Sequence, residues 1–274
     1  MSTEHKFGSD WTVKKLDVIE KYLGFFTTAL KNQGFKLCYI DAFSGSGNVT
    51  LKNGVVTDGS AIRALKYPFD RYILIEKDEE YHNALKQKIE ASDRANNITL
   101  LQGDCNELLK TLNGKQWYSE KWRGVIFLDP YAMELDWKSL TKISNTRAFD
   151  VWYLFPYSAV TRNLENKGNI PQANKERLNR IFGTDNWKDE LYKESEQLTL
   201  FGDSEMEKIP DGLKQFIIKR LGETFPKVAQ EPAILKNAMN SPLFLLCFAV
   251  SNPNKTAQDL AMRAANHILK HTED

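Results

Sequence analysis

Five short apolar runs, separated by stretches of helical periodicity, dominate residues 35–155. The runs are 35–41 (FKLCYID), 71–76 (RYILIE), 98–102 (ITLLQ), 123–129 (RGVIFLD) and 149–155 (FDVWYLF). Helices are expected between them at 59–67, 78–91, 105–113 and 136–145. Because continuous apolar strands alternating with helices need cover on both faces, the pattern predicts a mainly parallel α/β sheet.

The segments on either side of this alternation complete the predicted domain. A helix is expected at 11–32, a hairpin at 48–57 around the turn Asn53-Gly54, and a mostly helical stretch at 158–222. Two strands and a helix follow, at 232–237, 243–250 and 254–270. We therefore predict one domain over residues 1–274, with a Rossmann-like, seven-stranded, mainly parallel sheet. Its last strand is antiparallel, and a helical insertion at about 158–222 separates strands five and six.

Charge and cysteine content narrow the class of protein. The 37 basic and 36 acidic residues give a formal net charge of +1, which is less basic than a dedicated nonspecific nucleic-acid binder. Cys38, Cys105 and Cys247 are far apart and form no metal-binding pattern, so no metal site or disulfide framework is expected. The polar N-terminus and the lack of a long apolar run predict a cytoplasmic protein without a membrane partner.

Segments rich in acidic residues and glycine follow four of the predicted strands. They are Asp41 to Gly47 (DAFSGSG), Glu76-Lys77, Gly103-Asp104-Cys105 and Asp129-Pro130-Tyr131. Ligands of open α/β sheets bind outside the carboxyl ends of the strands, so the four segments are predicted to line one cleft. Each alone also fits a structural role: a glycine-rich turn, two helix N-caps and a strand-ending proline turn.

A nicotinamide dinucleotide is the competing ligand for such a fold. That class would require G-x-G-x-x-G after the first strand and an acidic residue about 20 residues later. Here Thr50 stands where the third glycine is needed, and Glu76 comes 35 residues after Asp41. The order of the segments instead favours S-adenosylmethionine (SAM).

Each segment has an expected contact with SAM. Asp41 would hold the methionine amino group, Glu76 the ribose hydroxyls and Asp104 the adenine amino group. Ser60 opens a helix and would either meet the methionine carboxylate or only cap the helix. The predicted cofactor-binding residues are Asp41, Phe43, Ser44, Gly45, Gly47, Ser60, Glu76, Lys77, Asp104 and Cys105.

At these residues the sequence resembles the class I SAM-dependent methyltransferases. DAFSGSG is similar to their glycine-rich first motif, and IEKD to their ribose-binding acidic strand end. LDPY resembles the Asp-Pro-Pro-Tyr segment of enzymes that methylate adenine or cytosine, with one proline missing. A closer resemblance, through DGSAIRAL, FLDPYAMELDW and DVWYLFPYSAVTRNL, is to the bacterial three-Cys-motif partner proteins. It implies the same fold and a cysteine-motif protein as partner.

The fourth segment suggests the chemistry of an enzyme. Asp129 and the Pro130 carbonyl could accept hydrogen bonds from an amine, and Tyr131 could stack on a planar acceptor. These three are the predicted catalytic residues, for N-methylation of a planar amine such as a nucleic-acid base. Trp11, Lys14 and Lys15 either approach the same cleft or form a solvated face.

Three functions remain open from the sequence. The chain could methylate nucleic acid, methylate a protein or small-molecule amine, or bind SAM as a noncatalytic partner in a protein complex. Residues 157–180 carry a local charge excess of +3 that would suit phosphates or a solvated helix face equally well.

Overall fold

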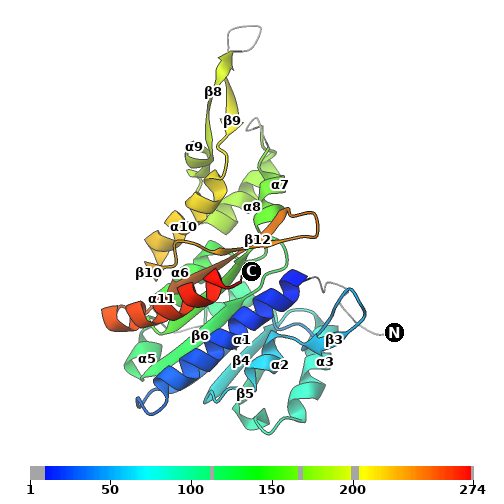
Figure 1. The fold of residues 1–274 in the computed structure, drawn as a ribbon, viewed down its shortest axis with the longest axis vertical. Helices are drawn as coiled ribbons and strands as arrows, with labels where there is room; N and C mark the ends of the chain where they lie inside the picture. Colours follow the sequence, from blue (N-terminus) through cyan, green and yellow to red (C-terminus); the bar gives the residue numbers. More distant parts are fainter. Residues whose placement is uncertain (1–9, 112–113, 166–168, 199–203, 273–274) are drawn as a thin grey trace.

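A mainly parallel sheet forms the centre of the molecule, which is described here from a computed structural model covering residues 10–111, 114–165, 169–198 and 204–272 (Figure 1). The strand order is β10-β12-β7-β6-β1-β4-β5, and β11 also pairs with β12. Neighbouring strands from β7 to β5 are parallel, whereas β12 is antiparallel to β7. The strands are β1 (Lys36–Asp41), β4 (Arg71–Glu76), β5 (Ile98–Gln102), β6 (Trp122–Leu128), β7 (Phe149–Phe155) and β12 (Pro242–Val250). The predicted Rossmann-like fold of the class I methyltransferase type is confirmed.

The outer edge strand is divided in two, which differs from the single strand expected at 232–237. β10 (Lys227–Val228) pairs with the end of β12, and β11 (Ala233–Lys236) pairs with its beginning. Pro232 precedes β11 and has no N–H to give to a ladder, so it interrupts the edge. The described sheet therefore has eight strands in seven positions.

Helices cover both faces of the sheet, as continuous apolar strands require. One face forms a hydrophobic core with four helices, α1 (Asp10–Leu30), α2 (Ser60–Ala64), α3 (Glu79–Glu90) and α11 (Lys255–Lys270). The other packs against α4 (Cys105–Leu109), α6 (Trp137–Asn145) and helices of the insertion. The central strands β1 and β6 are almost fully buried between these layers, and β7 is buried at every residue.

The insertion contains a β-hairpin, so the mostly helical prediction for 158–222 is wrong over part of its length. It comprises α7 (Tyr157–Asn163), α8 (Gln172–Phe182), α9 (Trp187–Leu191), α10 (Gly212–Thr224) and the strands β8 (Tyr192–Leu198) and β9 (Ser204–Lys208). The hairpin projects from the top of the molecule in Figure 1. Its strands (YKESEQL and SEMEK) are mostly polar, so they lack the apolar alternation that marks a half-buried strand.

Smaller elements complete the described fold. The hairpin after β1 is formed by β2 (Asn48–Thr50) and β3 (Val56–Asp58). η1 (Ala95–Asn97) precedes β5, and α5 (Gly114–Ser119) precedes β6.

Among the residues described, no helix is both long and apolar enough to cross a bilayer.

Candidate functional site

The four segments singled out in the sequence lie together at the carboxyl end of the parallel strands, where β5, β4, β1 and β6 end side by side. Asp41 is in register with Leu74 and Phe127 of the neighbouring strands, and Glu76 with Gln102. Backbone hydrogen bonds link the turns beyond the strand ends, including Gly103 N to Glu76 O at 3.0 Å. We call these four turns the strand-end site.

Asp41 supports the turn after β1 from inside. Its side chain is fully buried, and its carboxylate accepts from Tyr39 Oη at 3.2 Å and from Phe43 N at 3.3 Å. Burial, with a smaller contribution from the nearby Asp129, raises the pKa of Asp41 to about 6, against hydrogen bonds from Ser60 and Phe43. These contacts position the turn, while the contact of Asp41 with a methionine amino group stays a prediction.

The glycine turn between β1 and β2 combines a rigid part with an open part. Ser44 is buried and donates through Oγ to Asp41 O at 3.0 Å and through N to Ile75 O at 2.9 Å. Gly45 and Gly47 have positive φ angles of 60° and 83°. A Cβ on Gly45 would meet nothing within 4 Å, whereas one on Gly47 would meet the Leu85 side chain at 3.0 Å. Gly45 therefore presents backbone at an open surface, as a ligand-contacting glycine would.

Glu76 connects the first two turns. One carboxylate oxygen accepts from Gly45 N at 2.7 Å and the other from Asp78 N at 2.8 Å. Asp78 caps α3 by accepting from Tyr81 N, so the helix-capping role falls to Asp78 and leaves Glu76 at the edge. A carboxylate has about four acceptor sites, so two further donors such as ribose hydroxyls can be accommodated.

The third turn shows a structural role for its aspartate. Asp104 caps α4 by accepting from Asn106 N at 2.9 Å, and its carboxylate lies 3.3 Å from Lys77 Nζ. The N–H of Asn106 and the Lys77 ammonium lower the pKa of Asp104, although partial burial opposes them. Cys105 is buried, and burial raises the pKa of its thiol to about 12, which makes it unreactive packing. The adenine contacts of these residues stay predictions.

Asp129 pairs with a lysine 114 residues earlier in the chain. Lys15 of α1 makes a close ion pair with Asp129 Oδ2, and the Lys15 side chain is only 9% exposed. The Lys15 Nζ also lies 5.1 Å from the centroid of the Trp11 ring. Lys15 thus reaches the strand-end site, whereas Lys14 is exposed to solvent. The ion pair holds a negative charge beside the buried Asp41.

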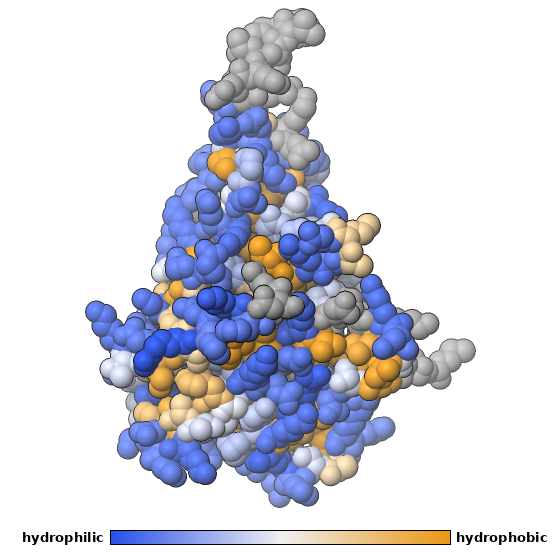
Figure 2. Space-filling view, in the orientation of Figure 1, coloured by the Kyte–Doolittle hydropathy of each residue, from blue (hydrophilic) through white to orange (hydrophobic). Residues whose placement is uncertain are grey.

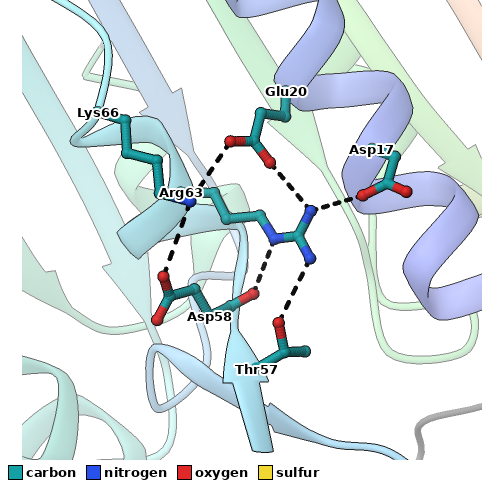
Figure 3. A network of polar contacts seen from close by, with 6 residues as sticks. All are labelled: Asp17, Glu20, Thr57, Asp58, Arg63 and Lys66. Carbon is teal, nitrogen blue, oxygen red and sulfur yellow. Dashed lines mark hydrogen bonds and ion pairs between the residues drawn. The ribbon is translucent and has the colours of Figure 1, made fainter.

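A polar network fixes the helix that delivers Lys15 (Figure 3). Arg63 of α2 donates from Nη1 to Asp17 at 2.7 Å and to Glu20 at 3.0 Å, both on α1. Its Nε donates to Asp58 O at 3.0 Å, which adds the β2–β3 hairpin to the same network. Ser60 begins α2 while Gly59 is its N-cap, so the alternative in which Ser60 only caps the helix is wrong. The Ser60 hydroxyl bonds to Asp41, and its contact with a methionine carboxylate stays a prediction.

The segment after Asp129 combines a fixed and a free residue. Pro130 is buried, while Tyr131 is 70% exposed and available to a planar ligand. The following residues are held by Asn163 of α7, whose Nδ2 lies 3.4 Å from Met133 Sδ. The insertion therefore borders the strand-end site.

Asn106 is a structural residue of the site that the sequence did not reveal. Its Nδ2 donates to Glu134 O at 2.8 Å, and its Oδ1 accepts from Asp136 N at 2.9 Å and Ser139 Oγ at 2.8 Å. One amide thus links the third turn to the chain beyond the fourth. These partners lie about 30 residues away, and no local pattern marks them.

A surface hollow of about 480 Å³ opens near this edge. It is lined by Asn48, Asp58, Ile62, Leu65, Lys66, Lys88 and Ser92, which come from β2, β3, α2 and the region of α3. None of the four turns of the strand-end site lines it. The ligand hypothesis therefore depends on the convergence of the turns.

Comparison with known proteins supports the fold and leaves the family open. No family model and no curated protein matches the chain, so the three-Cys-motif partner resemblance stays a prediction. Among solved structures, protein LPL1258 of Legionella pneumophila, of the DUF519 family model, is 14% identical, with a TM-score of 0.51 over 96% of this chain and 94% of that one.

Two further structures have lower TM-scores. A putative SAM-dependent methyltransferase of Listeria monocytogenes is 13% identical over 86% of this chain and 98% of that one, with a TM-score of 0.40. The N-terminal domain of EvdMO1 with SAH bound is 12% identical over 85% of this chain and 80% of that one, with a TM-score of 0.41. Identities this low bear on the fold alone.

Proposed function

We propose that this chain binds SAM at the strand-end site and transfers its methyl group to a planar amine. The observation that carries the proposal is the convergence of Asp41, Glu76 and Asp129 on the ends of adjacent strands. Ligands of open α/β sheets bind at this edge, where the strand order reverses. Here the strand order reverses between β1 and β6, next to Asp129.

The residues of the site fit the cofactor in part. Glu76 has acceptor capacity for two hydroxyl groups beyond its two backbone partners. Gly45 leaves room for a ligand to approach the backbone. Asp41 is buried beneath the turn and holds it by accepting a hydrogen bond from Phe43 N. When bound, SAM would supply a methyl group already activated on a sulfonium.

Asp129 and Tyr131 would act on the methyl acceptor. Lys15 contacts Oδ2 of Asp129, which leaves Oδ1 to accept an N–H of the acceptor amine. That hydrogen bond makes the nitrogen lone pair more available and orients it toward the methyl group. The exposed Tyr131 ring stacks on the planar acceptor.

The Lys15–Asp129 ion pair also favours a second candidate function. The ammonium already occupies the carboxylate that a methyl acceptor would use. A protein that binds SAM without transferring the methyl group, as part of a complex with a cysteine-motif protein, is consistent with this pairing. Labelled-methyl transfer to DNA, RNA and protein separates the two.

The cofactor is tested by thermal unfolding with SAM or NAD, because a ligand that binds the native state raises the Tm. We expect SAM alone to raise the Tm, and Glu76→Gln to abolish the rise. Glu79→Gln, an exposed neighbour, is the matched control and keeps it. A rise with NAD, or one unaffected by Glu76→Gln, contradicts the proposal. Asp129→Asn should keep the SAM shift and lose methyl transfer.

A further inference from the structure

A cluster of cations on aromatic rings lies at the opposite, amino end of the sheet. We call it the amino-edge cluster; its members are Phe35, Lys36, Arg71, Tyr118, Trp122, Arg123 and Arg147. Its cations come from the beginnings of β4, β1 and β6 and from the turn before β7, which are adjacent in the sheet. In Figure 1 this end is marked by α5 and the C-terminal end of α1.

Cation–π contacts connect the cluster on the side of β1 and β4. Lys36 Nζ and Arg71 Cζ each lie 4.8 Å from the centroid of the Trp122 ring, which is nearly buried between them and the core. Lys36 N also donates to Lys121 O at 3.0 Å, which brings a further exposed lysine to the edge. Two positive charges thus lie against one indole ring.

The other half of the cluster is built on Tyr118 of α5. Arg123 Cζ lies 4.2 Å from the Tyr118 centroid and 4.5 Å from that of Phe35. Arg147 Cζ lies 5.3 Å from the Tyr118 centroid. Tyr118 is half-buried, so part of its ring is accessible beside two guanidinium groups.

Most cations of this edge have no ion-pair partner among the described residues, whereas Arg123 interacts electrostatically with the buried Asp150. Within the described part of the chain, no ion pair involves Lys36, Arg71, Lys121 or Arg147, although ion pairs are formed by lysines and arginines elsewhere, including Lys15, Arg63, Lys77, Arg180 and Lys219. The acids nearby are Asp70, which accepts from Leu37 N at 2.6 Å, the exposed Glu120 and the buried Asp150. The edge therefore keeps a local positive excess in a chain of net charge +1.

We infer that the amino-edge cluster binds the phosphates of a nucleic-acid strand. Adjacent strands are about 4.8 Å apart, so the row from β4 to β7 spans roughly 14 Å, enough for several successive phosphates. Arginine binds phosphate through two parallel N–H groups, and an accessible ring beside it can stack on a base. A row of one lysine and three arginines on aromatic rings fits the phosphates of a nucleic-acid strand better than it fits an acidic protein surface.

This surface is independent of the proposed cofactor site. Strands of six or seven residues place it about 20 Å from the strand-end site. Binding there can be measured without SAM and without methyl transfer, so the failure of either proposal leaves the other standing.

The test is fluorescence anisotropy with labelled 12-nucleotide single-stranded RNA and DNA across a salt series. The variant is Lys36→Gln/Arg71→Gln/Arg147→Gln, in which all three side chains are exposed. The matched control, Lys138→Gln/Arg177→Gln/Arg263→Gln, removes the same three charges from exposed positions elsewhere. Each phosphate contact contributes about 0.7 to the slope of log K against log salt for a single strand, so the slope should fall by about 2.

At low salt we expect the Kd of the amino-edge variant to be at least tenfold higher than that of the unmodified chain. The Kd of the control should change less than twofold. Equal losses in the two variants would show that only net charge matters and would overturn the assignment. No binding by the unmodified chain would overturn it as well. Equally effective competition by poly-glutamate at the same charge concentration would point to an acidic protein partner instead.

Discussion

The pairing of Lys15 with Asp129 places opposite charges from distant parts of the chain in a largely enclosed position. Lys15 is 9% exposed and Asp129 is 23% exposed at their side chains. Removing one partner of such a pair leaves an uncompensated charge, here beside the buried Asp41 carboxylate. The ion pair is therefore expected to matter to stability as well as to the site.

Lys15→Met should lower the free energy of unfolding by on the order of 2–3 kcal/mol at pH 7, because Asp129 keeps its charge and loses its cation. Urea denaturation measures the loss. In an Asp129→Asn background the same lysine change should cost much less. Additive losses in the double variant would mean that the two side chains do not interact.

Gly47 and Gly45 offer a comparison within one turn. Both have positive φ, but only at Gly47 would a Cβ press on Leu85, Ile62 and Lys88, at 3.0–3.2 Å. We expect Gly47→Ala to lower the free energy of unfolding by about 2 kcal/mol or more and Gly45→Ala by about 1 kcal/mol. Equal effects, measured by thermal or urea unfolding, would mean that the Gly47 contacts relax without cost.

Sequence reasoning located the turns of the site but not every side-chain contact in them. Strand ends are readable because apolar runs stop abruptly at Asp41, Glu76 and Asp129. The reach of Lys15 across 114 residues depends on how α1 is rotated against the sheet, and a helical period does not specify that. The same holds for Asn106, whose three partners come from a loop and helix beyond the fourth turn.

The helix α1 depends on α2 for its position near the site. Arg63 is 12% exposed and donates to Asp17, Glu20, Asp58 O and, at 3.4 Å, Thr57. One guanidinium therefore joins α1, α2 and β3. The exposed Lys66 adds only weaker contacts, at 3.4 Å to Glu20 and 3.9 Å to Asp58.

Arg63→Met should lower the free energy of unfolding by about 2 kcal/mol, because it leaves Asp17 without its cation and Glu20 with only the exposed Lys66, while keeping most of the side-chain volume. Lys66→Met is the matched control and should cost less than about 0.5 kcal/mol, as an exposed pair does. Hydrogen exchange should also show faster opening of α1 in the arginine variant alone. Equal effects of the two changes would contradict the anchoring role.

Elements with strong apolar patterns were predictable, and those without were not. The parallel strands and the long helices bury a continuous face, which the spacing of apolar residues reports. The β8–β9 ribbon in Figure 1 extends beyond the body, and Figure 2 shows a largely hydrophilic surface toward that end. Its strand sequences are mostly polar and show no apolar alternation. The break between β10 and β11 follows from Pro232, which a strand prediction can use only once the edge position is known.

Across the whole molecule, two buried carboxyl groups link folding to pH. Burial raises the pKa of Asp150 to about 7, against the hydrogen bond from Tyr22 Oη at 2.7 Å and the charge of Arg123. Burial also raises that of Asp41 to about 6. Each group would have its ordinary pKa, about 3.8, in the unfolded chain. The folded state therefore binds more protons than the unfolded state between about pH 4 and pH 7.

The sign of the resulting pH dependence follows from linkage. Where the folded state holds the extra proton, the free energy of unfolding falls as the pH rises. The contribution of Asp150 is fully present below its unfolded pKa and is lost as the pH passes its folded pKa near 7. A shift of this size corresponds to on the order of 4 kcal/mol between those limits.

Asp150→Asn should remove most of this slope, because the amide is neutral at every pH and its oxygen can still accept from Tyr22. The free energy of unfolding measured in urea from pH 4 to pH 8 should fall less steeply than in the unmodified chain. Asp259→Asn, at an exposed position of α11, is the matched control and should keep the original slope. Since all other titrating groups are common to the three proteins, the difference in slope isolates Asp150. Parallel pH curves for the unmodified chain and Asp150→Asn would show that Asp150 is already ionised within the fold.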